Sequence, residues 1–382
     1  MLLSKRSLAS VNYLVSSIPK PASVPVHQKK PKPKDLPPAD ASSLVYTPND
    51  LNNYFRYKEY GKPSNAQLTK ADSFFAKHTP KHEWTCAKYE DIPDIKINRL
   101  QNEHQEKLAR IEPYQRTEYH DNLEKQRSTY GYSAEVLRPL PEILLLGHTN
   151  AGKSTMVNTL FKSERNKKEG HLAFVSRRAG FTKCLNSFNV GGKLRIIDSP
   201  GYGEYGEVKQ GEVVLDYIRN RSLLRRVFLL VDSKIGFQEE DSMLIDTLVE
   251  LGTPFEIIFT KVDEIVSREF PKFKIKSAKN DIDGRLGGFE MTREGNSKVL
   301  SYYNDLVNGT GLRDLASMPR LLFNNSQTNK LLTKKMGYRE IRYAILESCS
   351  LIEAPQAVVN EDVVTSQANK ERRKRTRRGI RV

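Results

Sequence analysis

The stretch "GHTNAGKST", residues 147–155, decides the fold of this chain. It matches the pattern G-x-x-x-x-G-K-S and stands between the apolar run "PEILLLG" and the segment "STMVNTLF", whose composition predicts a helix. A strand, a glycine-bearing turn and a helix in this order are the context that a phosphate-binding loop requires. The glycines let backbone N–H groups close around phosphates, and the start of the helix adds partial positive charge. Lys153 would then reach the β- and γ-phosphates, and Ser154 would bind Mg²⁺.

Short aliphatic runs alternate with amphipathic segments on both sides of this loop. Near-continuous aliphatic runs are typical of strands that are buried on both faces of a mostly parallel sheet. Leucines and isoleucines recur between the runs at helical spacing, as in Leu244 and Leu248. The alternation predicts an α/β domain over residues 138–350. Its expected strands are "PEILLLG" (141–147), "CLNSFNV" (184–190), "KLRIID" (193–198), "RVFLLVD" (226–232), "FEIIFT" (255–260) and "RLLFN" (320–324).

Two further motifs follow predicted strands and indicate which nucleotide binds. In "TKVD" (260–263), the Asp263 carboxylate can accept both N1–H and N2–H₂ of guanine, whereas adenine offers no such pair of donors. In "DSPG" (198–201), Asp198 would bind Mg²⁺ through water, and the Gly201 N–H would meet the γ-phosphate. Thr182 is the candidate switch threonine that joins Mg²⁺ when the γ-phosphate is present. The order of these motifs predicts GTP and GDP binding.

These stretches resemble the EngB (YihA/YsxC) family of ribosome-biogenesis GTPases, which belongs with the translation-factor-related GTPases that include Era and EngA. The resemblance rests on "FFAKHTPKHEW", "PEILLLGHTNAGKSTMVNTL", "DSPGYG", "YIRNRSLLRRVFLLVDSKIG", "IIFTKVDEI" and "GYREIRYAIL". It covers roughly residues 70–95 and 140–350. It implies a P-loop GTPase fold with Lys153 and Thr182 as catalytic positions and Mg²⁺ as cofactor. The nucleotide-binding positions that it implies, together with weakly matched ones, are Gly147, His148, Thr149, Asn150, Ala151, Gly152, Lys153, Ser154, Thr155, Asp198, Gly201, Thr260, Lys261, Asp263, Ser326 and Gln327.

The chain departs from the family pattern at several positions. His148 stands where the family usually has Arg, and the switch segment reads Ala179-Gly180-Phe181-Thr182 instead of Pro-Gly-Arg-Thr. The last guanine-contacting motif is best matched by Ser326-Gln327-Thr328. Asn150 is not needed to bind phosphate, so two interpretations stay open. In the first, the Asn150 side-chain carbonyl coordinates K⁺ beside the phosphates, as the resemblance to families with this loop pattern suggests. In the second, Asn150 only shapes the loop.

Positive charge is concentrated at the two ends of the 382-residue chain, whose net charge is +16. Residues 1–34 hold seven lysines and arginines and no acid, and residues 370–382 hold eight against one glutamate. The first twenty residues are rich in serine and place apolar side chains along one stripe, which predicts a mitochondrial transit peptide. An ordinary disordered terminus is the alternative. The arginine-rich end predicts contact with RNA, because it would release counterions from phosphates. A solubility tail and a nuclear-localisation signal are the alternative interpretations.

Composition divides the chain into four segments. We expect a transit peptide and proline-rich linker over 1–40, an N-terminal extension over 41–137, the G domain over 138–350 and a disordered basic tail over 351–382. Clustered aromatic residues in the extension predict packing on the G domain, and a charged insertion near 99–128 is helix-prone. A second insertion spans about 270–315. The three cysteines are far apart and support neither a zinc site nor a disulfide framework.

The expected mechanism is attack of water on the γ-phosphate. Many GTPases place a water-orienting Gln after the glycine of "DSPG", but this chain has Tyr202 there, which predicts slow intrinsic hydrolysis. His148 and Glu204 are candidate replacements, and each is expected to be a solvated side chain. We expect a free monomer in the mitochondrial matrix of a eukaryote, with a fungus as one candidate source. Three functions stay open: assembly of the large ribosomal subunit with rRNA, regulation of mitochondrial translation on ribosomes or mRNA, and RNA-binding scaffolding.

Overall fold

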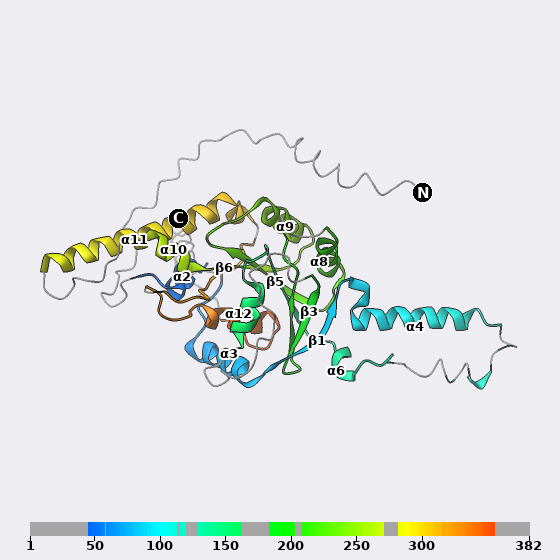
Figure 1. Cartoon of the computed structure of the whole chain (residues 1–382). Helices are drawn as coiled ribbons and strands as arrows, with labels where there is room; N and C mark the ends of the chain where they lie inside the picture. Colours follow the sequence, from blue (N-terminus) through cyan, green and yellow to red (C-terminus); the bar gives the residue numbers. More distant parts are fainter. Residues whose placement is uncertain are drawn as a thin grey trace, which may run out of the picture. The chain divides into compact units, whose positions relative to one another are not determined.

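A single mixed sheet forms the centre of the described molecule (Figure 1). The computed structural model describes residues 45–355 except 58, 113–114, 116, 120–121, 123–128, 162–182, 203–207, 271–281, 316 and 330. The strand order is β1-β3-β4-β2-β5-β6-β7, and every pairing is parallel except those of β3 with β1 and β4. The predicted mostly parallel α/β sheet is therefore confirmed. The strands are β1 (Pro80–Cys86), β2 (Glu142–Gly147), β3 (Leu185–Val190), β4 (Leu194–Asp198), β5 (Leu224–Asp232), β6 (Phe255–Thr260) and β7 (Leu321–Phe323).

Helices cover both faces of the sheet. Successive β2 residues point to opposite faces, so Leu144 and Leu146 pack with α8, α9, α10, α11 and α2, while Ile143 and Leu145 pack with α7, α12 and α3. No described helix is long and apolar enough to cross a membrane. The helices are α2 (Pro48–Tyr54), α3 (Asn65–Lys77), η2 (Tyr89–Asp91), α4 (Pro93–Ala109), α6 (Ala134–Leu137), α7 (Lys153–Leu160), α8 (Val208–Asn220), α9 (Glu239–Glu250), α10 (Val262–Glu269), α11 (Ile282–Gly309), η6 (Leu312–Asp314) and α12 (Tyr338–Ser348).

The six strands expected from aliphatic runs are all present, with ends that differ by at most two residues. Strand β1 was not predicted, because "PKHEWTC" has three consecutive polar residues and no aliphatic run. Its mixture of buried and exposed residues suits an edge strand with one face on the core, where Trp84 is buried. The aromatic residues of the extension pack on the sheet as predicted, since Phe55 and Trp84 belong to the same apolar cluster as β2 and β5.

Buried ion pairs join the extension to the strands that carry the site. Arg195 of β4 donates from Nε to Glu83 of β1 at 2.6 Å. Arg221, which follows α8, bonds Glu142 of β2 at 2.6 Å and Asp94 of α4 at 2.7 Å. Because each carboxylate faces a guanidinium, the charges are neutralised where water is excluded. The extension therefore contributes both a strand and charged partners to the body of the protein.

Candidate functional site

The phosphate loop connects β2 to α7, as predicted. The backbone of Gly147 has a φ of 149°, and an added Cβ would lie 2.4 Å from the Leu230 carbonyl oxygen, so this position requires glycine. Asn150 is exposed and has a φ of 66°, a left-handed conformation that asparagine tolerates better than most residues. This backbone angle supports the loop-shaping interpretation of Asn150, and the exposed carboxamide remains available to a cation.

Lys153 lies at the first position of α7 and is buried in the loop. Its Nζ donates to the carbonyl oxygens of Gly147 at 2.7 Å and His148 at 2.9 Å. Burial lowers the pKa of the Lys153 ammonium to about 8, while Asp198 and Asp241 favour its charged form. The ammonium is thus held at the mouth of the loop by exchangeable carbonyl contacts. An anionic phosphate can take the place of these contacts.

Ser154 and Asp198 meet at the position predicted for the metal. The Ser154 hydroxyl donates to Asp198 Oδ2 at 2.9 Å, and Asp198 Oδ1 is buried without a hydrogen-bond partner in the described structure. Burial raises the pKa of Asp198 to about 6, whereas Lys153 and the Ser154 hydroxyl lower it. A hydroxyl beside a carboxylate with an unused oxygen fits Mg²⁺ and a metal-bound water. Thr182, the third predicted ligand, lies outside the described residues.

The chain after β4 returns to the phosphate loop. Thr149 donates from its backbone N–H to the Tyr202 carbonyl oxygen at 3.0 Å, and an added Cβ on Gly201 would lie 2.7 Å from Thr149 Cα. The Tyr202 hydroxyl donates to Asp241 of α9 at 2.5 Å, and its ring lies 4.7 Å from that of His148. We call these contacts the Tyr202 latch. They hold Gly201 directly against the loop.

His148 is not the solvated side chain that the sequence suggested. Its side chain is 21% exposed, and Nε2 lies 3.6 Å from Glu240 Oε2 and 3.9 Å from Asp241 Oδ2. Burial raises the pKa of Asp241, the carboxyl that also accepts from the Tyr202 hydroxyl. The expectation was wrong because α9 approaches the loop from a distant part of the chain. Glu204, the other candidate, lies outside the described residues.

The motif predicted to read guanine, residues 260–263, lies at the end of β6 and the start of α10. Thr260 donates from Oγ1 to the Ala151 carbonyl at 2.8 Å, which ties this motif to the phosphate loop. Lys261 has a φ of 56°, and its Nζ donates to Asp232 Oδ2 at 2.6 Å. Asp263 Oδ1 is buried without a partner among the described residues, and burial raises the pKa of this carboxyl. A buried acceptor of this kind fits the paired donors of guanine.

The loop after β7 lies beside the predicted guanine motif. Asn325 donates from Nδ2 to the carbonyls of Gln327 at 2.7 Å and Lys334 at 3.0 Å. The Ser326 hydroxyl lies 2.8 Å from the Tyr338 hydroxyl. Asn329 donates from Nδ2 to the Asp263 carbonyl oxygen at 3.1 Å, so the loop touches the helix that carries Asp263. The structure thus brings the Ser326–Gln327 segment to the same end, while direct base contact by these two residues stays a prediction.

Sequence reasoning did not identify two aspartates and one asparagine that support the site. Asp232 positions Lys261, Asp241 accepts from Tyr202, and Asn325 shapes the last loop. Asp232 closes the run "RVFLLVD", so its place at the end of a strand was a usable signal. Asp241 and Asn325 carry no comparable signal, because their partners are distant in the chain or are backbone carbonyls.

Comparisons with known proteins identify the family of this chain. The family described as "50S ribosome-binding GTPase" matches residues 142–261. "MIOREX complex component 8" of Saccharomyces cerevisiae is 35% identical over 302 residues, which cover 79% of this chain and 80% of the yeast protein. "Probable GTP-binding protein EngB" of Thermotoga petrophila is 36% identical over 178 residues, which cover 44% of this chain and 86% of the bacterial protein.

Among solved structures, a crystal structure of Aquifex aeolicus Era is 18% identical and aligns with a TM-score of 0.35, over 55% of this chain and 56% of that chain. The sequence relatives decide the family, because they match at 35% and 36% identity over most of their own length. This chain therefore belongs to the EngB family of GTP-binding proteins.

Proposed function

We propose that this protein is a mitochondrial GTPase switch that acts in assembly of the large ribosomal subunit. The observation that carries the proposal is the joined site, in which the Thr260 hydroxyl links the guanine motif to the phosphate loop. The family description names 50S ribosome binding, and the yeast relative is named for the MIOREX complex. The acid-free leader supports a mitochondrial location, and the basic end supports contact with rRNA.

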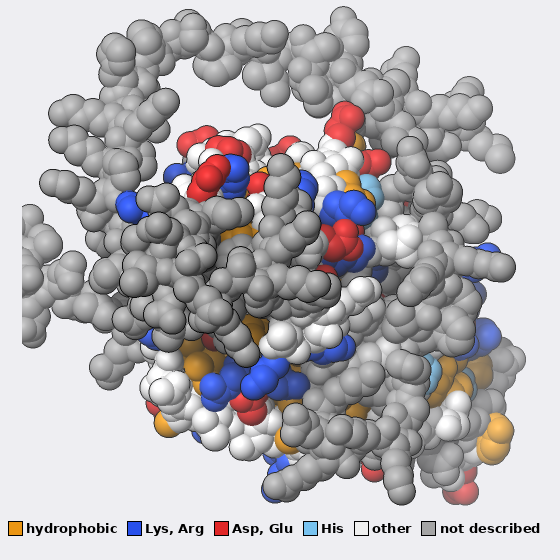
Figure 2. Space-filling model, turned by 60° about the vertical axis from the view of Figure 1, so that its left-hand side comes forward, with side chains coloured by type: hydrophobic (Ala, Val, Ile, Leu, Met, Phe, Trp, Pro, Cys, Tyr) orange, Lys and Arg blue, Asp and Glu red, His pale blue; other side chains and the backbone are white. Residues whose placement is uncertain are grey.

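The surface charge of the body supports different roles for the folded part and for the two ends of the chain. Figure 2 shows basic and acidic side chains interspersed on the face that it draws, without one sign covering the described surface there. A nearly neutral body and strongly basic ends suit a protein whose folded part recognises shape and nucleotide. The ends would then supply salt-sensitive attraction to RNA, because arginine-rich segments release counterions from phosphates.

In the proposed reaction, the chain positions and neutralises the reacting phosphates. Lys153 would exchange its carbonyl contacts for phosphate oxygens, and Ser154 and Asp198 would hold Mg²⁺ and its water. Bound Mg²⁺ supplies positive charge that stabilises the phosphate oxygens in the transition state. Tyr202 already donates to Asp241 and is packed against His148, so its hydroxyl is poorly placed to orient the attacking water. We therefore propose that intrinsic hydrolysis is slow and that a large partner accelerates it.

Sedimentation of tagged protein from mitochondria tests the proposal. We expect co-migration with immature large subunits when a non-hydrolysable GTP analogue is added, and release when GDP is added. Asp263→Asn, assayed with GTP and xanthosine nucleotides in turn, is the matched control, because only the base contact changes. Co-migration with complete ribosomes or mRNA would favour translational regulation instead. Binding that is insensitive to nucleotide would favour an RNA-binding scaffold.

A further inference from the structure

Helix α11 lies in the second insertion, a segment to which the sequence assigned no role. Figure 1 shows α11 alongside α10, the helix that begins within the predicted guanine motif. The C-terminal half of α11 also packs against the turn after β5, since an added Cβ on Gly236 would lie 2.9 Å from Leu306 Cδ2. Asp232 stands at the start of this turn. We call Asp232 and residues 260–263 the base end of the nucleotide site, and α11 contacts the elements that carry it.

Two adjacent tyrosines of α11 hold Ser233, the residue after Asp232. The Tyr303 hydroxyl donates to Ser233 Oγ at 3.0 Å, and the Tyr302 hydroxyl donates to the Ser233 carbonyl oxygen. Tyr303 and Ser233 are completely buried, so loss of the bond between them would leave a buried polar group unsatisfied. The Ser233 N–H donates to the Thr260 carbonyl oxygen at 3.0 Å. Ser233 is thus fixed from two sides, by α11 and by the end of β6.

The turn that begins at Ser233 sets the direction of the Asp232 carboxylate. Asp232 Oδ1 accepts from the Lys234 N–H at 3.0 Å, and Oδ2 accepts from Lys261 Nζ at 2.6 Å. The Asp232 side chain is 6% exposed, so it has little room to reorient while Ser233 stays in place. With its ammonium anchored there, the aliphatic stem of Lys261 can cover the flat face of a bound base.

The rings of both tyrosines are held independently of their hydroxyls. The Tyr303 ring lies 5.4 Å from that of Phe259 and 5.0 Å from that of Phe323. The guanidinium of Arg268, on α10, lies 4.5 Å from the centre of the Tyr302 ring. Phenylalanine at either position would therefore keep this packing and remove the hydroxyl that holds Ser233.

We propose that α11 positions the base end, with Tyr302 and Tyr303 as the positioning residues. Their hydroxyls hold Ser233, the turn at Ser233 directs the Asp232 carboxylate, and Asp232 anchors Lys261 over the base. This arrangement slows the release of a bound nucleotide through the flat face of its base, and it contributes nothing to phosphate binding. The inference rests on guanine-nucleotide binding at this site and is independent of the proposed role in ribosome assembly.

The test measures how fast the full-length protein releases a fluorescent GDP analogue in stopped flow. Tyr302→Phe and Tyr303→Phe should each speed release about threefold, and the double variant about tenfold, because each change removes one hydrogen bond that fixes Ser233. Binding of magnesium tripolyphosphate, which has no base, should be unchanged in calorimetry. A merely structural loss would weaken both ligands alike, so this comparison isolates the base end.

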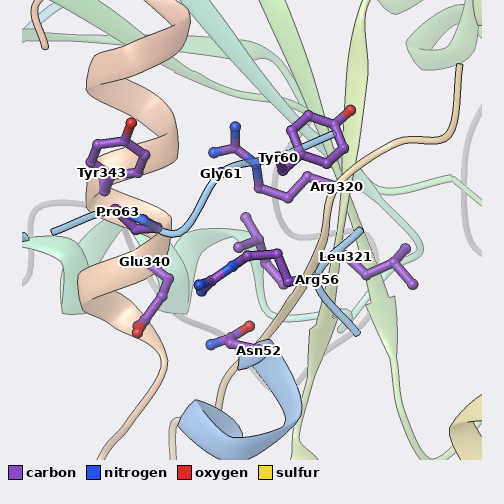
Figure 3. A pocket seen from close by; sticks show the side chains of 10 residues that line it. Asn52, Arg56, Tyr60, Gly61, Pro63, Arg320, Leu321, Glu340 and Tyr343 are labelled. Atoms are coloured by element: carbon purple, nitrogen blue, oxygen red, sulfur yellow. The ribbon is translucent and has the colours of Figure 1, made fainter. Parts of the chain in front are cut away.

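Tyr60→Phe is the matched control. Figure 3 shows Tyr60 beside Arg320, at a hollow near the start of β7. The Tyr60 hydroxyl donates to the Met318 carbonyl oxygen at 2.8 Å, so this variant loses a bond of the same kind as Tyr302→Phe. The predicted nucleotide loops follow the other end of β7. Tyr60→Phe should therefore release the GDP analogue at the wild-type rate.

Asp232→Asn and Lys261→Met show whether the effect passes through the anchored lysine. In either background, Tyr303→Phe should add no further increase in the release rate, since the charged pair that it positions is already lost. Lys261→Met keeps the apolar stem, so it serves as the second background if Asp232→Asn does not fold.

Three outcomes would overturn the role of α11. The first is release of the GDP analogue from both tyrosine variants at the rate of the wild type or of Tyr60→Phe. The second is weakening of tripolyphosphate by the same factor as the GDP analogue, and the third is a full additional effect of Tyr303→Phe in the Lys261→Met background. A wild type that binds tripolyphosphate but no GDP analogue would overturn guanine binding together with this proposal.

Discussion

The phosphate end and the base end of the nucleotide site differ in their balance of charge. At the phosphate end, buried Lys153 lies near buried Asp198. Lys153 donates to loop carbonyls, and Asp198 accepts from the Ser154 hydroxyl. At the base end, Asp263 has one buried oxygen without a partner, and the nearby Glu264 raises its pKa further. Both ends thus hold one buried carboxylate oxygen without a partner, Asp198 Oδ1 and Asp263 Oδ1, but the phosphate end also holds the buried Lys153 ammonium.

This difference separates two tasks. Phosphates must displace bonds that the loop already makes, so part of their interaction energy is lost in the exchange. Guanine supplies donors to an acceptor that lacks them, so more of that interaction contributes to affinity. We therefore expect the base end to determine which nucleotide binds and the phosphate end to respond to the presence of the γ-phosphate.

The largest expected effect is at the base end. Asp263→Asn replaces one acceptor with a donor and should weaken GTP and GDP by about 10²- to 10⁴-fold, because two charge-assisted hydrogen bonds are affected. The variant should prefer xanthosine nucleotides, which present an acceptor there. Titration with fluorescent nucleotides measures both changes. Equal affinity of the wild type for ATP and GTP would contradict the role of Asp263.

The charge balance of the phosphate end should appear in the stability of nucleotide- and metal-free protein. Asp198 has a folded pKa of about 6 against an ordinary 3.8, so the folded state keeps this proton to higher pH than the unfolded chain. The free energy of unfolding should therefore fall as the pH rises from about 4 to about 6, by about 3 kcal/mol from this group. Urea titrations across this range should show a smaller fall for Asp198→Asn than for the wild type. Identical pH profiles would show that burial does not penalise the Asp198 charge.

A smaller effect is expected from the Tyr202 latch. Tyr202→Phe removes the hydroxyl that donates to Asp241, which weakens the contacts that hold Gly201 against Thr149. Loss of one hydrogen bond of about 1 kcal/mol should raise the affinity for GTP relative to GDP about fivefold. Tyr119→Phe, at a side chain that is 69% exposed, is the control. An unchanged ratio of GTP to GDP affinity in Tyr202→Phe would show that the latch does not oppose the γ-phosphate.

The smallest expected effect concerns Asn150 and a monovalent cation. If its carboxamide coordinates K⁺, hydrolysis should be a few times faster in KCl than in NaCl, and both Asn150→Ala and Asn150→Gly should lose this difference. If Asn150 only allows the φ of 66°, Asn150→Gly should behave as the wild type, while Asn150→Ala should bind GDP more weakly. Phosphate release measured in the two salts separates these outcomes.

The predictable part of the site lies where a strand ends in a motif. Gly147, Asp198 and Asp263 each stand at or just after the end of an aliphatic run, and parallel strands bring their carboxyl ends to one edge. The partial burial of His148 was not predictable, because it depends on Glu240 and Asp241 of α9. Strand β1 was also missed, since its mostly polar sequence resembles a loop until its pairing with β3 is known.

The sequence by itself determined the order of β2 to β7 in the chain, the phosphate loop, the predicted guanine motif and the charge of the two ends. These features depend on neighbouring residues, whose periodicity and backbone requirements act locally. Only the tertiary structure decided that Tyr202 bonds Asp241, that Lys261 bonds Asp232, and that Asn52 covers the edge of β7 271 positions away. Such contacts form when the packing of helices on the sheet brings distant polar groups together, and burial then requires each of them to find a partner.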